Sequence, residues 1–355
     1  MKVGFLGLPG SGKTSLFNVV TGRELDPAEM GKTQSRMAVV KVPDPRLPRL
    51  AEILSSAELI HPEMTFVDLV ALHHDDGDGL QNDSLTKLVG DADALALVIQ
   101  GFGEMDHQGN ELSPAADLEA LLLEMTITDL AIVEGRMERI EAKLKSSRDK
   151  SSVERTLLQG VADHLTEGLL VRDLPMSEEE ALLLRGFSLL TNKPLLVVLN
   201  VADDDLSGER CREAIELAER MGLDYEIIAV TLEQEIAALD EEMRDAFLAD
   251  YGLAEPARDR FIRACYDLLG VITFFTGNEK EARGWTVEGG STVREAGGKI
   301  HSDIYDGFIR AEIAPFAKLD ELGSFAACRQ AGAIRLEGRD YITEDGDYLD
   351  IRFSR

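Results

Sequence analysis

Residues 7–14 read Gly-Leu-Pro-Gly-Ser-Gly-Lys-Thr, which matches the phosphate-binding pattern G-x-x-x-x-G-K-[ST]. An apolar stretch, Lys2 to Leu6, precedes this loop, and a helical stretch begins at Ser15, so the motif has the strand-loop-helix context that it requires. The glycines let backbone N–H groups surround an anion at the positive end of a helix dipole. The stretch therefore predicts a P-loop nucleotide-binding domain of the α/β class.

Two residues of the loop and one later acid carry the predicted phosphate chemistry. Lys13 is expected to reach the β- and γ-phosphates and to act catalytically, and Thr14 is expected to bind Mg²⁺. Asp68 ends the apolar stretch that begins at Thr65 and is the second expected ligand of Mg²⁺. The predicted substrate is ATP or GTP. The other expected contacts with its phosphates come from the loop and its flank: Gly7, Leu8, Pro9, Gly10, Ser11, Gly12 and Ser15.

A second loop has the position of a base-reading loop. Asn200-Val-Ala-Asp203 follows an apolar strand where GTPases carry N-K-x-D. Asn200 is expected to brace the loop, and Ala202 and Asp203 are expected to contact the base. Val201 replaces the Lys whose stem would cover the purine. A loop acid after a strand is otherwise a turn residue or helix cap, and this alternative stays open.

The residues expected to sense the γ-phosphate and to position water have diverged. Ala71 stands where guanine-nucleotide switches carry a Gly whose N–H meets the γ-phosphate, and Leu72 stands where many carry a Gln. An aliphatic side chain cannot orient a water nucleophile. His107 follows the strand that ends near Ile99 and is the expected catalytic residue, because a loop histidine could swing over the phosphates. The alternative for His107 is an exposed loop residue.

Strands and helices alternate from residue 1 to about 100, which is typical of a parallel sheet with helices on both faces. Residues 116–186 are almost all helix formers. Apolar residues at spacings of three and four predict an antiparallel helical hairpin, either packed in the core or projecting as an arm. One stripe is Leu130, Val133, Met137, Ile140 and Leu144; the returning stripe is Leu158, Val161, Leu165 and Leu169.

The sheet pattern resumes at Lys193 and ends in helices that reach residue 270. Short strands separated by Gly-containing turns follow and predict a small β-grasp. The predicted organisation is a nucleotide-binding G domain in residues 1–115 and 187–270, a coiled-coil insertion in 116–186, and a β-grasp domain in 271–355.

The composition of the chain limits its partners and compartment. A formal charge of −29 argues against a general basic surface that would wrap nucleic acid. Residues 1–60 carry eight Lys and Arg against six Asp and Glu, so the excess acid lies later and leaves ribosome contact open. The longest apolar runs have the length of strands, which predicts no membrane span. Single, scattered cysteines predict no disulfides and fit a cytoplasmic protein, which we expect to be a monomer.

With these residues in place, the chain resembles the YchF family of Obg-like ATPases along nearly its whole length. The N-terminal similarities are Gly7-Leu-Pro, Gly12-Lys13, Ser15-Leu-Phe-Asn18, Val42-Pro-Asp-Pro-Arg-Leu47, Gly79-Leu80 and Asn82. The more specific C-terminal similarities are residues 269–276, Trp285-Thr286, Ile300-His301, residues 307–312, 335–338, 340–342 and 345–347.

This resemblance implies a G domain, a coiled-coil insertion and a C-terminal TGS domain. It also implies hydrolysis of ATP in preference to GTP and association with the large ribosomal subunit. The family reads the base with N-x-x-E, whereas this chain has the shorter Asp203. Gly10-Ser11 and Ala229-Val-Thr231 also depart from the family's usual Asn-Val and S-A-K, so base choice and rate stay open.

Three functions are compatible with these residues. The first is a slow Mg²⁺-dependent nucleoside triphosphatase that switches the binding of a ribosomal or other translation-related partner. The second is a nucleotide-gated binding module with little or no hydrolysis, which the replacements at Ala71 and Leu72 favour. A P-loop kinase is a weaker third hypothesis, because no acceptor pocket or lid arginine is evident.

Overall fold

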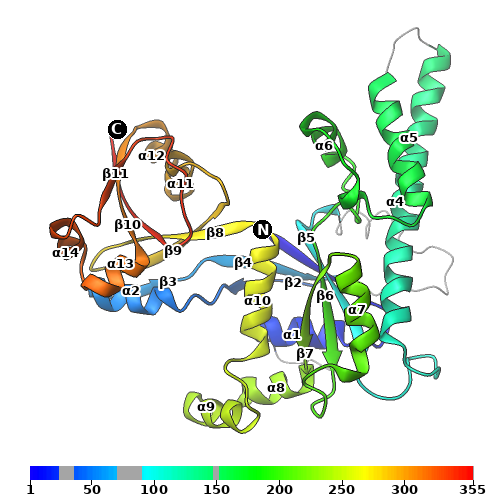
Figure 1. Ribbon diagram of the computed structural model, residues 1–355, viewed down its shortest axis with the longest axis horizontal. Helices are drawn as coiled ribbons and strands as arrows, with labels where there is room; N and C mark the ends of the chain where they lie inside the picture. Colours follow the sequence, from blue (N-terminus) through cyan, green and yellow to red (C-terminus); the bar gives the residue numbers. More distant parts are fainter. Residues whose placement is uncertain (24–35, 70–89, 147–151, 355) are drawn as a thin grey trace. The chain divides into compact units, whose positions relative to one another are not determined.

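The computed structural model describes residues 1–23, 36–69, 90–146 and 152–354 (Figure 1). The chain divides into two compact units. The first comprises Met1–Val39 and Thr65–Phe261, and the second comprises Val40–Met64 and Ile262–Arg355. The sequence had suggested that residues 40–64 belong to the nucleotide-binding domain, but they cluster with the C-terminal residues.

The first unit is built on a six-stranded sheet of order β2-β4-β1-β5-β6-β7. The pairs β4–β1, β1–β5, β5–β6 and β6–β7 are all parallel, as the alternating pattern predicts. The strands are β1 (Lys2–Leu6), β2 (Arg36–Lys41), β4 (Glu63–Asp68), β5 (Ala94–Gly101), β6 (Leu195–Val201) and β7 (Asp224–Ile228). Strands β5 and β6 are buried along their whole length, which explains their continuous apolar sequences.

Helices cover both faces of this sheet. On one face, Phe5 of β1 packs against Phe17 of α1 (Lys13–Thr21) and Phe261 of α10 (Ala257–Leu268), with ring centroids 6.1 and 5.7 Å away. On the other face, Leu95 and Leu97 of β5 belong to a core that includes residues of α4 (Pro114–Ser146) and α7 (Arg212–Arg220). Two further helices of the unit follow β7, α8 (Val230–Ala238) and α9 (Glu241–Asp250).

The helical insertion has two parts. The first turns of α4 are buried in the core of the sheet, and its later turns pack against α5 (Ser152–Thr166) in a separate apolar cluster (Figure 1). Val133 and Ile140 of the predicted first stripe are buried in that cluster, as are Leu158, Val161 and Leu165 of the returning stripe. The prediction that Leu169 belongs to the returning stripe is wrong, because α5 ends at Thr166 and Leu169 is 45% exposed. The insertion ends with a short 3-10 helix, η2 (Val171–Asp173), and with α6 (Glu178–Arg185).

A buried carboxylate connects α4 to the segment that enters β6. The carboxylate of Asp129 accepts hydrogen bonds from the N–H groups of Leu190 and Thr191, both at 2.8 Å, and from the Thr191 hydroxyl at 2.6 Å. Burial raises the pKa of Asp129 above its ordinary value. The helical insertion is therefore anchored by polar bonds as well as by apolar packing.

The second unit is a mixed six-stranded sheet of order β11-β10-β12-β8-β9-β3, with helices on its two faces. One apolar cluster includes residues of α2, α13 and α14, and the other includes residues of α11. The strands are β3 (Glu58–Ile60), β8 (Val271–Gly277), β9 (Glu281–Glu288), β10 (Phe308–Pro315), β11 (Arg335–Glu337) and β12 (Asp347–Phe353). The helices are α2 (Arg46–Leu54), α11 (Val293–Ile300), α12 (Ser302–Asp306), α13 (Phe316–Leu322) and α14 (Phe325–Gln330).

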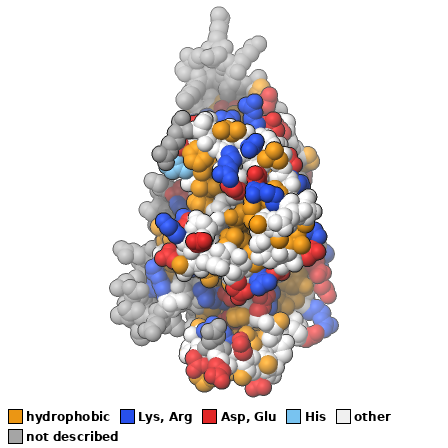
Figure 2. Space-filling view, turned by 90° about the vertical axis from the view of Figure 1, so that its left-hand side faces the viewer, with side chains coloured by type: hydrophobic (Ala, Val, Ile, Leu, Met, Phe, Trp, Pro, Cys, Tyr) orange, Lys and Arg blue, Asp and Glu red, His pale blue; other side chains and the backbone are white. Residues whose placement is uncertain are grey.

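Residues 40–64 join this unit through α2 and β3. Leu47 and Leu50 of α2 are fully buried in the same cluster as Phe275 of β8. Strand β3 pairs in parallel with β9. On the face shown in Figure 2, acidic, basic and apolar side chains are interspersed.

Cys211, Cys265 and Cys328 are all buried and free of disulfide bonds, as the scattered positions predict. Among residues 1–23, 36–69, 90–146 and 152–354, no helix combines the length and apolarity needed to cross a membrane.

Candidate nucleotide-binding site

The loop between β1 and α1 has the backbone that the phosphate-binding motif requires. Gly12 precedes the first residue of α1 and has φ = 83°, in the left-handed region that favours glycine. A Cβ atom at Gly12 would stand 2.1 Å from Nδ2 of Asn200, so a side chain is excluded there by contact as well as by conformation. The N–H of Ser11 donates to the Leu8 carbonyl at 3.2 Å and closes the turn that contains Pro9.

Lys13, Thr14 and Asp68 meet at the carboxyl ends of β1 and β4. These strands are parallel neighbours, and this register brings Asp68 to the start of α1. The Lys13 ammonium donates to the Asp68 carboxylate and to the Leu69 carbonyl, and the Thr14 hydroxyl donates to the other oxygen of the same carboxylate at 3.0 Å. The side chains of Lys13 and Asp68 are only 7% and 8% exposed. The structure thus brings together the three residues expected to meet phosphate and Mg²⁺.

This arrangement fits a Mg²⁺ ion chemically. The Thr14 hydroxyl and the Asp68 carboxylate provide two hard oxygen donors within hydrogen-bonding distance of each other. Mg²⁺ is usually held by only one or two protein oxygens, together with phosphate oxygens and water.

Asn200 joins the phosphate loop to the predicted base loop. Its Nδ2 donates to the Ser11 carbonyl at 3.0 Å, and its Oδ1 accepts from the N–H of Val230 at 3.3 Å. Because Asn200 lies in β6 and is 4% exposed, the strand holds this side chain firmly. Asn200 therefore braces the phosphate loop through one hydrogen bond and is itself held by the start of α8 through the other.

Asp203 has a buried oxygen without a protein partner. Its Oδ1 makes no hydrogen bond within the described ranges. The neighbouring Asp205 accepts from the N–H groups of Glu209 and Arg210 at 2.8 and 3.0 Å, so Asp205 is the residue that caps the next turn. Asp203 itself lies in a turn, which the N–H of Asp205 closes by donating to the Ala202 carbonyl at 3.0 Å, so the turn-residue alternative holds and the helix-cap alternative does not. The unpaired, buried oxygen of Asp203 needs a donor in addition. Ala202 lies between Asp203 and Val201, the last residue of β6, which is 2% exposed.

His107 lies beside the phosphate loop. A Cβ atom at Gly10, which has φ = 85°, would stand 3.1 Å from the Cβ of His107 and 3.3 Å from Oε1 of Gln100. The imidazole of His107 is exposed, so it is free to meet a ligand at the loop. The structure thus brings this predicted catalytic residue next to the site.

The loop that carries His107 is held at two points. Nε2 of Gln100 donates to the carbonyls of Phe102 and Met105, both at 3.1 Å. The Asp106 carboxylate accepts from the N–H groups of Gln108 and Asn110, both at 2.8 Å, and from Nδ2 of Asn110 at 3.0 Å. Hydrogen bonds from Asn110 lower the pKa of Asp106 and keep it ionised.

The sequence analysis does not predict Gln100 or Asp205 as residues of the site. Each acts through hydrogen bonds to nearby backbone, and no motif spacing identifies either one. Ser15 lies in the first turn of α1, and Ser11 is a buried residue whose hydroxyl has no partner within the described ranges. Ala71 and Leu72 lie outside the described residues.

Two family models match this chain. Residues 2–135 match a model described as "50S ribosome-binding GTPase", and residues 271–354 match the C-terminal YchF GTPase model, described as "Protein of unknown function (DUF933)". The Ribosome-binding ATPase YchF of Haemophilus ducreyi is 34% identical over 360 residues, which cover 99% of each chain. The chain belongs to the YchF family. The Bacillus subtilis protein of the same name is 33% identical over 365 residues, covering 100% of this chain and 99% of its own.

A solved YchF structure agrees with this assignment. The Schizosaccharomyces pombe YchF GTPase matches with a TM-score of 0.86 and 25% identity, over 99% of this chain and 97% of that one. The resemblance to YchF is thereby confirmed. So is the predicted α/β fold class, with a P-loop G domain followed by the C-terminal YchF domain.

Proposed function

We propose that this YchF-family protein hydrolyses ATP slowly with Mg²⁺, with GTP as a second substrate, and uses its nucleotide state to control binding to the ribosome. The chain is a nucleoside triphosphatase by its family. The observation that carries the proposal is the cluster of Lys13, Thr14 and Asp68 beneath a glycine loop braced by Asn200. The names of the relatives, Ribosome-binding ATPase, support both the substrate and the partner.

Each residue has a defined task in this proposal. The N–H groups of residues 10–13 surround the phosphates, and Lys13 exchanges its bond with Asp68 for the phosphate oxygens that it neutralises. Thr14 and Asp68 are the residues that would hold Mg²⁺, which supplies positive charge to the phosphates when bound. His107 holds the attacking water at the γ-phosphate, and the free oxygen of Asp203 accepts a hydrogen bond from the base.

A hydrolysis assay with Lys13→Ala tests the proposed chemistry. We expect turnover to fall at least tenfold in the variant, because the charge on the phosphates is no longer neutralised. Equal turnover in the wild type and Lys13→Ala would contradict the proposal. The alternative of a binding module predicts that single-turnover hydrolysis by the wild type matches the buffer rate; rapid single-turnover hydrolysis that His107→Ala abolishes would exclude this alternative.

A competition experiment tests the base contact. ATP and GTP compete for a fluorescent nucleotide on the wild type, Asp203→Glu and Asp204→Glu. Asp204 is the matched control because its carboxylate, 71% exposed, already pairs with Arg210 at 2.9 Å. We expect the ratio of the two affinities to change only in Asp203→Glu. An unchanged ratio in that variant would remove Asp203 from base recognition.

Ribosome binding has its own test. The wild type is sedimented with purified 50S subunits in the presence of a non-hydrolysable ATP analogue or ADP, and Lys13→Ala serves as the nucleotide-insensitive control. We expect the amount bound to differ between the two nucleotides for the wild type alone. Equal sedimentation in both nucleotides would contradict a nucleotide-controlled switch.

A further inference from the structure

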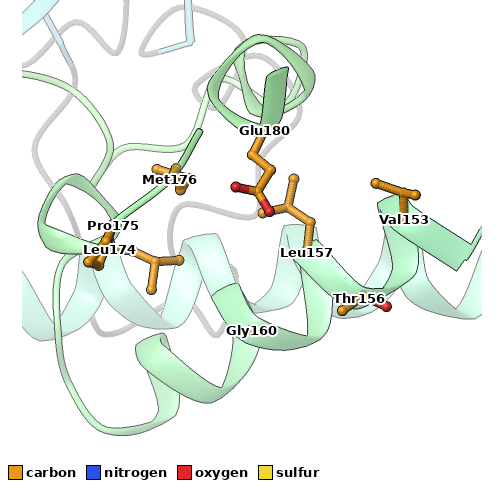
Figure 3. Close-up of a pocket in the computed structure, with 8 residues that line it drawn as sticks. All are labelled: Val153, Thr156, Leu157, Gly160, Leu174, Pro175, Met176 and Glu180. Carbon is orange, nitrogen blue, oxygen red and sulfur yellow. The ribbon is translucent and has the colours of Figure 1, made fainter. Parts of the chain in front are cut away.

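The helical insertion contains an open groove between α5 and the segment from η2 to α6. Val153, Thr156, Leu157 and Gly160 form one wall, and they lie on one face of α5 because they are spaced three, four and seven residues apart. Leu174, Pro175, Met176 and Glu180 form the other wall. Figure 3 shows Glu180 reaching from α6 toward Leu157. The groove has a volume of about 400 Å³, within the size range of ligand-binding clefts.

Gly160, the last of the four residues of the α5 wall, leaves its end of the groove open. A Cβ atom at this position would have no atom within 4 Å, so packing among the described residues does not require glycine there. A glycine inside an exposed helix costs roughly 1 kcal/mol relative to alanine. α5 therefore gives up helix stability at the point where a side chain would enter the groove.

One residue of the α6 wall, Glu180, is acidic. Glu178, Glu179 and Glu180 occupy the first turn of α6. The Glu180 carboxylate is held by the N–H and hydroxyl groups of Ser177, both at 2.9 Å, and these bonds lower the pKa of Glu180. Among the described residues, no Lys or Arg side chain is paired with Glu180. The Glu180 carboxylate thus presents a fixed negative charge beside an apolar wall, which repels the phosphates of RNA.

We infer that this groove binds a basic amphipathic helix of a partner protein, with apolar side chains against Leu157 and Leu174 and a Lys or Arg beside Glu180. The face from Val153 to Gly160 spans about 10 Å, or two turns of a helix, so two apolar side chains one or two turns apart match it. An apolar groove that receives one face of an amphipathic helix is a recurrent mode of recognition. This inference does not depend on the proposed nucleotide chemistry.

A labelled peptide tests the inference on the full-length protein. The probe is a helical peptide of about 14 residues, with Leu at positions i, i+3, i+4 and i+7 and Lys elsewhere, and binding is followed by fluorescence anisotropy. We expect saturable binding to the wild type, at least tenfold weaker binding to Gly160→Leu, and several-fold weaker binding to Glu180→Gln. Glutamine retains the capping-box pattern of α6 while removing the charge.

Two controls separate the groove from general attraction to an acidic protein. Glu167→Gln removes one exposed charge elsewhere in the insertion and should leave the affinity unchanged. Circular dichroism should show that Gly160→Leu keeps its helices, since its new side chain enters open space. Equal binding to the wild type and Gly160→Leu would overturn the inference. So would self-association or RNA binding that Gly160→Leu abolishes, because the groove would then belong to a second copy or to RNA.

Discussion

Gly12 shows how a single residue can be fixed by two independent constraints. A methyl group there would require φ = 83° in a residue other than glycine and would also collide with Nδ2 of Asn200. Gly22 has a similar φ of 65°, but a Cβ atom there would have no atom within 4 Å. The two positions therefore separate the cost of conformation from the cost of contact.

We predict that Gly22→Ala lowers the free energy of unfolding by about 1 kcal/mol and leaves nucleotide affinity unchanged. Gly12→Ala should lower it further and weaken nucleotide binding at least tenfold, because Asn200 must give up its hydrogen bond to the Ser11 carbonyl. Denaturant unfolding and nucleotide titration measure the two effects. If both variants bind nucleotide equally well, the contact with Asn200 has no role in shaping the loop.

Gln100 is predicted to position the loop that carries His107. Gln100→Leu removes both donors to the carbonyls of Phe102 and Met105, and we expect kcat to fall about tenfold or more while the nucleotide Kd stays within twofold. If the nucleotide Kd and kcat change together, the substitution damages the whole site, and Gln100 has no separate role in positioning the His107 loop. Gln159→Leu, an exposed glutamine of α5, is the matched control and should behave as the wild type.

Among the individual residues of the site, those that belong to a sequence motif could be predicted from the sequence. Lys13, Thr14 and Asp68 were predicted because phosphate and metal chemistry demands these residue types at fixed places relative to strand ends. Gln100 and Asp205 act by bonding to backbone groups of a folded loop, and the path of that loop is set by tertiary structure. Such residues carry no signal in a single sequence.

Asp129 links α4 of the helical insertion to the segment before β6 by three hydrogen bonds. We predict that Asp129→Asn lowers the free energy of unfolding by about 2 kcal/mol, because the amide cannot accept all three hydrogen bonds from Leu190 and Thr191. Asp163→Asn, on the exposed surface of α5, should cost less than about 0.5 kcal/mol. If the free energy of unfolding falls equally in the two variants, the buried hydrogen bonds of Asp129 do not contribute to stability.

Asp129 should also make the stability of the protein depend on pH. Burial raises the pKa of Asp129 above 3.8, so the folded protein binds its proton more readily than the unfolded chain does. The contribution of this titration to stability is fully present below pH 3.8 and is lost as pH rises through the raised pKa. The stability difference between the wild type and Asp129→Asn should therefore widen as pH falls toward 3.8. If the stability difference between the two proteins narrows as pH falls, the pKa of Asp129 is lowered in the folded protein and not raised.

The elements that the sequence predicted best are those with an unbroken apolar pattern. β1 is predicted over residues 2–6 and forms over those residues, because Val3 to Leu6 are buried and a strand buried on both faces must be apolar there. Leu169 continued the apolar spacing of α5 but lies beyond its last residue. Periodicity alone could not mark that end.

At the scale of the whole molecule, residues 40–64 could not be assigned from local pattern. They run from the end of β2 to the start of β4, two strands of the nucleotide-binding sheet, so the order of elements predicts an uninterrupted domain. The apolar face of α2 indicates only that something covers it. The covering residues begin more than 200 positions later in the chain, at Phe275 and Ala282.

Because α2 and the residues that cover it are far apart in the sequence, removing the C-terminal residues should uncover α2. The partners of α2 and β3 include Phe275, β9 and Leu319, which all lie beyond residue 270. A chain that stops at residue 270 would expose Leu47 and Leu50, at a cost of roughly 3–6 kcal/mol in lost burial. We expect limited proteolysis to cut the truncated chain within residues 40–64 well before it cuts the full-length protein there. β1, α1 and β6 keep their own core, so the truncated chain should still bind nucleotide. If residues 40–64 resist cleavage equally in both chains, they fold with the nucleotide-binding domain after all, and the division between the two units must be redrawn.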